Sequence, residues 1–480
     1  MNTIIQQIAV KMIEQILSDL LEKGVSSIGE TVQSLTGIVR STVLELISSV
    51  LQQMDDALCA AQKDRRADGL RVKERAVPRT VLTEMGELTY ARTYFESKEG
   101  SRCYLLDHLI QVESYERLTK ELSAALVQQA ADKSMAKAAK DMGVAVSRQT
   151  VNNRVLALKE VAISAERARE TPRELHVFVD EDHVHLKTGK SAIVPLVTVT
   201  EGIDTATTRH KTINAVHFEG YGMSNAALFE NVSAFLYERY DVDRLYRIYI
   251  YADGGLWIKA APDYLPNTKF VMDGFHLQKV LRKLMRLPGA MPHIGALREA
   301  MKQDDYAGFA DRCRCINENL DEPGKETLAE LEGYFKNNWE SIVARQTEDI
   351  CGSCTEPLVS HVLSERLSRN PLAWSEDGLR QMAMLQVYTK NGGVVQAKDI
   401  RISRDKEQRR ADKLRFTGGF EKYRAYADKQ IDTFLKQKLD WSIFDAPRER
   451  NGKLTGTRVL LNALARLNPR FPSSRFPRTS

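Results

Sequence analysis

The chain has 480 residues, of which 43% are hydrophobic and 28% charged, with 27 Gly and 14 Pro. This composition predicts a soluble protein of roughly three domains and excludes wholesale disorder, a collagen-like helix and a coiled-coil rod. No run approaches the ~18 apolar residues of a membrane span, and the first ten residues lack the basic segment of a signal peptide. Six Cys are too few for a disulfide scaffold. We therefore expect a cytoplasmic protein without a membrane partner.

The net charge of +5 is unevenly distributed. Residues 401–480 hold 20 Lys and Arg against 9 Asp and Glu, a net charge of +11, so residues 1–400 carry −6. The basic C-terminal tail, residues 391–480, therefore favours a polyanion as partner, although a solvated basic face gives the same signal.

Residues 1–75 have apolar side chains at helical spacing, interrupted by Gly24, Gly29 and Gly37. This pattern predicts several short amphipathic helices, which form either a helical cap or a dimerisation element. Residues 76–115 change to the period of strands, and they predict a small β-hairpin module with Gly86 at its turn.

Residues 116–165 return to helical spacing. Gly143 ends one helix, and Ser147 is the predicted N-cap of a second helix over residues 148–158. The outward side chains of that second helix are Arg148, Gln149, Asn152, Asn153 and Arg154. Arg, Gln and Asn carry the donors and acceptors that match base edges in the major groove. The segment predicts a DNA-binding helix-turn-helix, with a plain αα-hairpin as the alternative.

From residue 175 the pattern predicts strands at 176–186, 192–200 and 212–218, a helix at 224–240, and strands at 247–252 and 269–272. Three successive strands followed by crossover units are typical of a ribonuclease-H-like fold. We expect a mixed α/β catalytic core over residues 170–280 and 349–390. The charged helical residues 281–348 would be an insertion within it.

Three carboxylates are the candidate catalytic residues. Asp180 interrupts a hydrophobic strand and so requires a compensating partner. Asp253 directly follows the fourth strand, which neighbours the first in this type of sheet. Glu356 opens a later helix just before Pro357. Converging carboxylates repel unless cations neutralise them, and oxygen ligands select two Mg²⁺ ions, with Mn²⁺ able to substitute. Such a pair activates an attacking oxygen and stabilises the leaving one in a phosphodiester displacement.

Other residues near these positions leave alternatives open. Asp182 lies on the same strand face as Asp180 and could be the first ligand instead. Asp273 and His276 could give a further metal contact and an outer-shell hydrogen bond, or Asp273 could simply cap the helix that follows. Four thiols could bind zinc, with buried free thiols as the default, and they are Cys313, Cys315, Cys351 and Cys354.

At these residues the chain resembles the bacterial insertion-sequence transposases of the ISLre group, formerly described as an uncharacterised protein family. The matching segments are TEMGELTYARTYF at 83–95, VDEDHVHL at 179–186, YADGGLWI at 251–258, FVMDGFHLQK at 270–279 and EPLVSHVLSERLSRNPLAWSEDGLRQMAML at 356–385. The last segment is the most specific, and together they run over nearly the whole chain.

The resemblance implies a D-D-E transposase with Asp180, Asp253 and Glu356 as catalytic residues and a helical insertion before the Glu. It implies metal-dependent cleavage at terminal inverted repeats and strand transfer into target DNA. The helix over 148–158 would recognise the repeats, and Arg366, Arg369 and the tail would bind phosphates. A homodimer or higher oligomer on double-stranded DNA, in a bacterial cytoplasm at the nucleoid, is expected. The alternatives are a non-catalytic repressor derived from a transposase and a ribonuclease-H-like nuclease.

Overall fold

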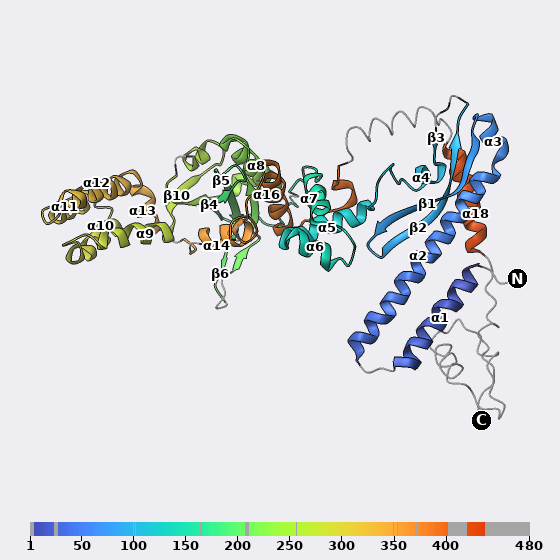
Figure 1. The fold of residues 1–480 in the computed structure, drawn as a ribbon. Helices are drawn as coiled ribbons and strands as arrows, with labels where there is room; N and C mark the ends of the chain where they lie inside the picture. The colour runs from blue at the N-terminus through green and yellow to red at the C-terminus, as the bar shows by residue number, and fades with distance from the viewer. Residues whose placement is uncertain are drawn as a thin grey trace. The chain divides into compact units, whose positions relative to one another are not determined.

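The computed structural model describes residues 4–23, 27–98, 100, 102–163, 166–206, 211–255, 257–348, 350–352, 354–369, 372–401 and 420–436. Most of the predicted basic tail therefore lies outside the described residues. The chain forms two compact units (Figure 1). Unit 1 comprises Met1–Ala125, Ala139–Ala145 and Ile402–Ser480, and unit 2 comprises Leu126–Ala138 and Val146–Arg401.

Unit 1 combines helices with a three-stranded sheet of order β1-β2-β3. Its elements are α1 (Ile4–Lys23), α2 (Ile28–Ala60), α3 (Gln62–Ala67), β1 (Arg71–Thr83), β2 (Gly86–Glu96), β3 (Arg102–Cys103), α4 (Leu105–Leu109) and α18 (Phe420–Leu435). Strands β1 and β2 are antiparallel, and Thr83 pairs with Gly86 across the turn. Gly86 has φ +129°, a conformation that glycine adopts most readily. The predicted hairpin is confirmed, although it begins at Arg71 rather than within residues 76–115.

The prediction of several short N-terminal helices is wrong. Helix α2 is 33 residues long and runs without interruption through Gly29 and Gly37, while Gly24 lies outside the described residues. A glycine inside a helix costs only about 1 kcal/mol relative to alanine. Helix α2 packs against α1, β2 and α18, and these tertiary contacts outweigh the local preference.

The predicted boundary between an N-terminal helical domain and a hairpin domain is also corrected. One hydrophobic core joins Leu58 of α2, Phe95 of β2, Leu105 of α4 and Tyr423 of α18. The N-terminal helices, the hairpin and a helix from the predicted tail therefore fold as parts of one unit.

Although no uninterrupted apolar run reaches the length of a membrane span, α2 is long and apolar enough on average to cross a membrane. This statement concerns length and composition alone. In the structure the C-terminal part of α2 is covered, since Leu51, Met54 and Leu58 are buried.

Unit 2 contains a five-stranded sheet and most of the remaining helices. Its elements are α7 (Arg148–Leu156), β4 (Glu174–His185), β5 (Ser191–Thr200), β6 (Gly202–Asp204), β7 (Lys211–Ile213), β8 (Val216–Glu219), α8 (Asn225–Arg239), β9 (Arg247–Ala252), β10 (Thr268–Met272), α9 (Gly274–Met285), α10 (Ile294–Lys302), α11 (Tyr306–Asn317), α12 (Glu322–Asn337), α13 (Trp339–Thr347), α14 (Thr355–Val359), α15 (Glu365–Leu367) and α16 (Glu376–Lys390). Short 3-10 turns are η1 (Val242–Arg244), η2 (Ile258–Asp263), η3 (Met291–His293) and η5 (Ala397–Asp399). Helices α5 (Lys120–Asp132) and α6 (Met135–Asp141) contribute residues to both units.

The sheet has the order β10-β9-β4-β5-β8. Strand β4 is antiparallel to β5, and β5 is antiparallel to β8, whereas β4 is parallel to β9 and β9 is parallel to β10. The predicted succession of strands and helices is confirmed, with one correction. The expected strand over 212–218 is divided at Asn214, which has φ +51°, so that β7 pairs with β6 and only β8 joins the large sheet.

The two faces of the sheet are covered by different segments. On one face, Val177 of β4 and Ile250 of β9 pack with Leu228 and other side chains of α8. On the opposite face, Phe178 and Tyr251 pack with Ala344 of α13. Helix α14 also lies against β4. The second face is therefore the one that the helices after β10 cover.

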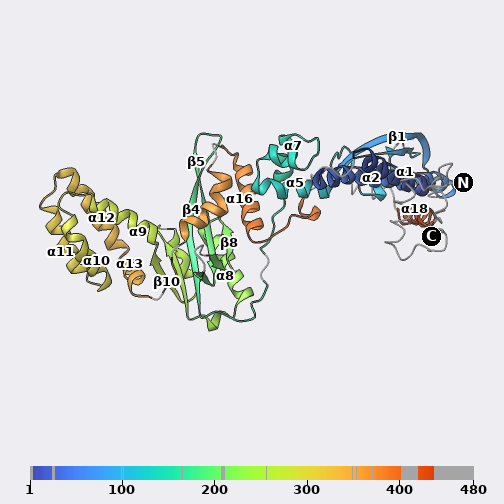
Figure 2. The same cartoon turned by 90° about the horizontal axis from the view of Figure 1, so that it is seen from below.

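The predicted helices of residues 281–348 are present. Helices α10, α11, α12 and α13 gather beside the β10 edge of the sheet (Figures 1 and 2) and enclose a hydrophobic core of their own around Leu297, Phe309 and Phe335. The two helices expected after the insertion are also present. The first is interrupted between α14 and α15 by a π-helical turn, η4 (Ser360–Ser364), of the kind that often occurs at functional sites.

The predicted pair of helices before the sheet is present as α6 and α7. Gly143 has φ +66°, and the Ser147 hydroxyl accepts a hydrogen bond from the Thr150 amide as an N-cap. Val151 and Val155 are buried, as predicted, and α7 packs against α16. Helix α7 ends at Leu156, two residues before the predicted end.

Candidate active site

Three carboxylates occupy one row across the parallel strands of unit 2. Phe178 of β4 pairs with Tyr251 of β9, so Asp180 and Asp253 follow in the same register. Ala252 of β9 pairs with Met272 of β10, which places Asp273 beside Asp253. Side chains in one row of a parallel sheet project from the same face, and neighbouring strands lie about 4.8 Å apart. The expectation that Asp180 and Asp253 lie on adjacent strands is confirmed.

Asp180 is the carboxylate most affected by its surroundings. Burial raises the pKa of its carboxyl group to about 6, and the charges of Asp253 and Asp273 also act to raise it. The hydrogen bond that Asp180 accepts from the Glu181 amide, 2.9 Å long, and the nearby His276 act in the opposite direction. A carboxylate that is destabilised by burial and by like charges is a site at which a cation binds favourably.

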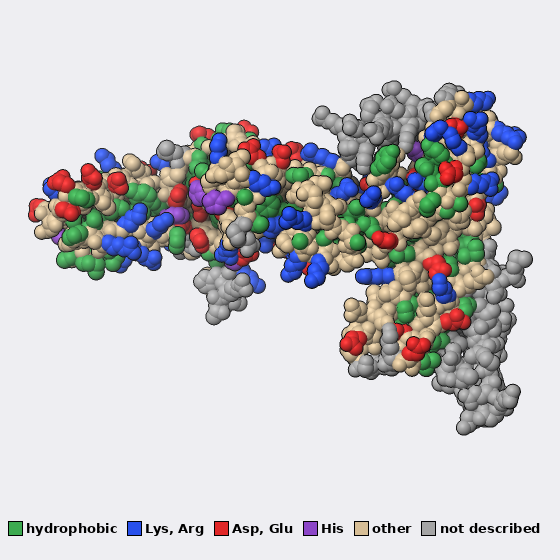
Figure 3. Space-filling view, viewed as in Figure 1, with side chains coloured by type: hydrophobic (Ala, Val, Ile, Leu, Met, Phe, Trp, Pro, Cys, Tyr) green, Lys and Arg blue, Asp and Glu red, His purple; other side chains and the backbone are tan. Residues whose placement is uncertain are grey.

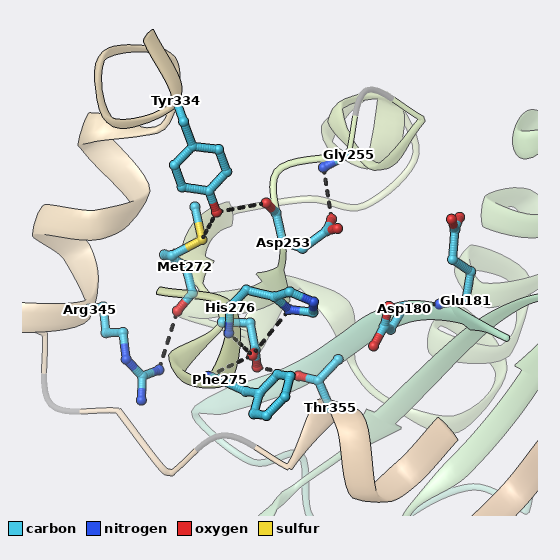
Figure 4. A network of polar contacts seen from close by, with 11 residues as sticks. Asp180, Glu181, Asp253, Gly255, Met272, Phe275, His276, Tyr334, Arg345 and Thr355 are labelled. Atoms are coloured by element: carbon cyan, nitrogen blue, oxygen red, sulfur yellow. Dashed lines mark hydrogen bonds and ion pairs between the residues drawn. The ribbon is translucent and has the colours of Figure 1, made fainter. Parts of the chain in front are cut away.

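His276 lies between the carboxylates in Figure 4. Its Nδ1 is 3.4 Å from Asp273 Oδ2, and the pKa of its imidazole is raised by Asp273 first and by Asp180 and Asp253 as well. A protonated His276 therefore supplies positive charge among three carboxylates. His276 thus lies beside the candidate residues Asp180 and Asp253, while its predicted outer-shell role stays a prediction.

Asp273 is the N-cap of α9, as the simpler interpretation held. Its Oδ2 accepts hydrogen bonds from the amides of Phe275 and His276, at 2.8 and 3.2 Å. Its Oδ1 accepts a hydrogen bond of 2.7 Å from the Thr355 hydroxyl, at the start of α14 (Figure 4). Asp273 is 1% exposed. With both oxygens engaged by donors, it positions neighbouring elements rather than offering a free metal ligand.

Glu356 follows Thr355 in the first turn of α14, and its side chain is exposed. The Thr355–Asp273 hydrogen bond thus fixes the backbone one residue away from Glu356 beside the carboxylate row. Within the residues that the structure describes, no three His, Cys, Asp or Glu side chains form a metal-binding group. The structure brings together Asp180, Asp253, Asp273 and His276, and it leaves the Glu356 side chain exposed to solvent.

Asp182 is held in a different way from Asp180. It is buried, and its Oδ1 accepts hydrogen bonds from Ser364 at 3.0 Å and Ser368 at 2.9 Å. The π-helical turn ends at Ser364, so the helix that carries Glu356 is attached to β4 through this carboxylate. Glu181 projects to the opposite face, where it accepts a hydrogen bond from the Trp257 indole. These contacts favour Asp180 over Asp182 as the residue that faces Asp253.

The helical insertion contacts the strand ends that carry the carboxylates. The Tyr334 hydroxyl of α12 donates to the main-chain oxygen of Asp253 at 3.1 Å, and Arg345 of α13 donates to the main-chain oxygen of Met272 at 3.2 Å (Figure 4). Asp253 Oδ1 itself accepts from the Gly255 amide at 2.9 Å. Sequence reasoning missed Tyr334, Arg345 and Thr355, because none of them stands in a motif that marks a distant contact.

The predicted DNA-reading side chains of α7 are only partly free. Arg148, Gln149 and Asn153 are exposed, whereas Asn152 and Arg154 are half-buried. Gln149 donates a hydrogen bond of 2.9 Å to Asn153. A base contact by either of these two side chains would have to replace that bond.

The predicted role of Arg366 as a phosphate-binding residue is corrected by its burial. Arg366 is buried, donates to the main-chain oxygen of Ala130 at 3.1 Å, and lies 5.1 Å from the ring centre of Trp374, which is also buried. It is thus a packing residue, because its guanidinium is already enclosed. Arg369 is more exposed and contacts Glu365 and Ser360.

The four candidate zinc ligands do not converge. Cys313 is buried in the core of the insertion, whereas Cys351 and Cys354 lie in the cluster around Tyr251. All the cysteines are free thiols. Burial raises the pKa of Cys313 and of Cys354 to about 12, which disfavours the thiolate that zinc requires.

The fold and site define a mixed α/β protein with a row of acidic residues across three parallel strands, within β4 and directly after β9 and β10. The chain matches the Uncharacterised protein family (UPF0236) over residues 20–404, and it belongs to this family. Its relatives include UPF0236 proteins of Caldanaerobacter subterraneus subsp. tengcongensis. One, whose name joins eleven locus labels, is 32% identical over 385 residues, covering 79% of this chain and 81% of the relative. A second relative is 32% identical over 386 residues, covering 79% of this chain and 82% of the relative. A third, whose name joins four locus labels, is also 32% identical over 386 residues and covers 79% of this chain and 81% of the relative.

Substitutions at Asp180 and Asp182 are expected to have different effects. Asp180→Asn should weaken Mn²⁺ binding by roughly tenfold or more, about 1.4 kcal/mol, because an amide cannot neutralise the cation. Asp182→Ala should leave the Mn²⁺ affinity unchanged but lower the free energy of unfolding by about 1–3 kcal/mol, because Ser364 and Ser368 lose their acceptor. Calorimetric titration with Mn²⁺ and urea unfolding measure the two effects. Weakened Mn²⁺ binding by Asp182→Ala would make Asp182 the first ligand instead.

Mn²⁺ binding is also expected to depend on pH. The pKa of Asp180 is about 6 in the folded protein against an ordinary value of 3.8, so the cation must displace a proton below pH 6. The affinity should therefore fall by about tenfold per pH unit below 6 and level off above 7. Without metal, the folded state should lose stability as the pH rises from 3.8 to about 6, because it retains a proton that the unfolded chain releases. A pH-independent affinity between 5 and 7 would contradict the assignment, and Asp180→Asn is the control in which the contribution of Asp180 disappears and only that of His276 is left.

Proposed function

We propose that this chain is a DNA transposase of a bacterial insertion sequence, with a ribonuclease-H-like core and a D-D-E site. The observation that carries the proposal is the carboxylate row. Asp180 and Asp253 face each other from adjacent parallel strands, and the helix that begins at Thr355 and Glu356 is attached beside them through Asp273. The sheet order β10-β9-β4-β5-β8, with its antiparallel and parallel pairs, supports the ribonuclease-H-like assignment.

The names of the relatives give independent support. A name that joins eleven locus labels indicates one protein sequence encoded at many places in a single genome. Names that join four and two labels repeat the pattern in the same organism. An element that moves or copies itself produces such multiplicity, whereas a repressor or a repair nuclease gains no copies from its own activity.

The residues present fit a divalent cation. Asp180 and Asp253 provide oxygen donors whose mutual repulsion a cation relieves, and the exposed Glu356, next to Thr355 in α14, would have to turn toward them to give the third carboxylate. Two Mg²⁺ ions, or Mn²⁺ in their place, would activate the attacking oxygen and stabilise the leaving oxygen at the phosphodiester. Tyr334, bonded to the main chain of Asp253, keeps the strand end in place without occupying its carboxylate.

The proposed reaction has two steps. Water attacks the phosphodiester at the end of the element, the bond from phosphorus to the 3′ oxygen breaks, and a 3′-hydroxyl is released. That hydroxyl then attacks a phosphodiester of target DNA, so that one bond forms for each that breaks and no external energy source is required. Helix α7 with its exposed Arg148 would read the terminal inverted repeat, and the protein would act as a dimer or larger oligomer on DNA in the bacterial cytoplasm.

Cleavage and joining of a labelled duplex that carries the element's own end test the proposal. With Mg²⁺, the parent protein should yield joined product, whereas Asp253→Ala and parent protein with Ca²⁺ should yield none. Asp182→Asn serves as the matched control and should still form joined product, since it changes a carboxylate on the same strand face but keeps the oxygen that accepts from both serines. Nicking without joining would favour a nuclease, and sequence-specific binding without any product would favour a repressor.

A further inference from the structure

Unit 1 contains a group of cations that neither the helix-turn-helix nor the tail includes. Arg71 and Lys73 of β1 and Arg102 of β3 all donate to the carboxylate of Glu96 on β2, at 2.8, 2.9 and 3.1 Å. We call these four residues the Glu96 cluster. The hydrogen bonds from Lys73, Arg71 and Arg102 lower the pKa of Glu96 to about 2, so its carboxylate is ionised under all physiological conditions.

The charges of the Glu96 cluster do not balance. Three cations surround one carboxylate, which leaves two positive charges in excess. The side chain of Glu96 is only 11% exposed, whereas those of Arg71, Lys73 and Arg102 are 76%, 38% and 51% exposed. The carboxylate therefore lies beneath its partners, and the cluster presents cations to solvent.

The position of the cluster leaves it accessible. Phe95, the neighbour of Glu96 in β2, is fully buried in the core that includes Leu58 of α2. Successive side chains of a strand point to opposite faces, so Glu96 lies on the face away from α2. Lys98 adds a further exposed cation nearby, since its side chain lies against Gly69 at the start of β1. Figure 3 shows Lys and Arg side chains over the part of unit 1 that holds β3 and α3.

We propose that the Glu96 cluster binds the phosphate backbone of double-stranded DNA. That the polyanion is DNA rests on the proposed function. That the cluster binds phosphate groups is argued from its exposed cations. Two guanidinium groups can each make paired hydrogen bonds to phosphate oxygens, and an ammonium group adds a point charge. Glu96 holds the three cations together before DNA arrives, which reduces the entropic cost of ordering them on binding. Such contacts position the protein without reading sequence.

The salt dependence of DNA binding tests this proposal. Fluorescence anisotropy with a labelled terminal-repeat duplex, from about 50 to 200 mM salt, gives the slope of log K against log salt. The double variant Arg71→Ala/Lys73→Ala should reduce the magnitude of this slope by about 0.9 for each phosphate that the variant no longer neutralises. It should weaken binding to an unrelated duplex by the same factor, because these phosphate interactions are independent of sequence.

Two further variants separate binding from folding. Lys11→Ala/Lys325→Ala removes two cations that are paired one to one, with Glu45 and Glu322, and should leave the slope unchanged. Glu96→Gln keeps an amide oxygen that can accept hydrogen bonds from the cations but removes the internal negative charge, so it should lower the melting temperature yet tighten DNA binding. A purely structural cluster would give no tightening.

The outcomes distinguish this proposal from the proposed function. An unchanged slope in Arg71→Ala/Lys73→Ala, or an equal change in the control variant, overturns the role of the cluster even if the parent protein cleaves and joins DNA. A parent protein that binds DNA but forms no product counts against the transposase alone, and the slope still decides the role of the cluster. No binding by the parent protein would overturn both.

Discussion

The register of three parallel strands brings acidic residues into one row, and this arrangement is unfavourable unless positive charge accompanies it. Asp180, Asp253 and Asp273 follow paired positions in β4, β9 and β10, so their spacing is set by the backbone and cannot relax by side-chain movement alone. Burial and the neighbouring carboxylates raise the pKa of Asp180, and the nearby His276 acts to lower it. A strand that shifted by one residue would turn its carboxylate to the other face of the sheet. The surrounding elements therefore matter because they hold the three strands in this register.

The helical insertion holds the strands that carry the carboxylate row through hydrogen bonds to main-chain oxygens, so these contacts do not neutralise the carboxylates. Tyr334 and Arg345 of the insertion donate to carbonyl oxygens of Asp253 and Met272, and they leave the carboxylates of Asp180 and Asp253 to other partners. Thr355 is different, because it bonds directly to the Asp273 carboxylate, which the N-cap role has already engaged. The insertion and α14 therefore fix the positions of the strand ends. Charge compensation is left to His276 and to any cation that binds.

The sequence predicts those features whose signal is local. Asp180 and Asp253 are recognisable because a charged residue interrupts or ends a hydrophobic strand, whereas the π-helical attachment of Asp182 has no such signature. The length of α2 is not predictable in this way, because Gly29 and Gly37 weaken a helix locally, while the packing that outweighs them comes from distant segments.

Arg366 is a natural candidate for phosphate binding because arginine is usually exposed, and only the fold shows that Ala130 and Trp374 enclose it. Thr355, Tyr334 and Arg345 are separated by tens of residues from the groups that they contact. Their roles depend on tertiary structure, which the pattern of a single segment does not encode.

The charge of the candidate site also bears on where affinity for DNA must arise. A row of carboxylates repels a phosphodiester until cations occupy it, so the site that would perform the chemistry contributes little to the first encounter. Attraction has to come from groups such as the Glu96 cluster, whose excess charge is positive and whose cations are exposed. That cluster belongs to unit 1, whereas the carboxylate row and α7 belong to unit 2, so the proposed phosphate contacts and the proposed chemistry are assigned to different compact units. In this arrangement the Glu96 cluster would supply attraction that is independent of sequence, while sequence reading by α7 and the chemistry would remain within unit 2.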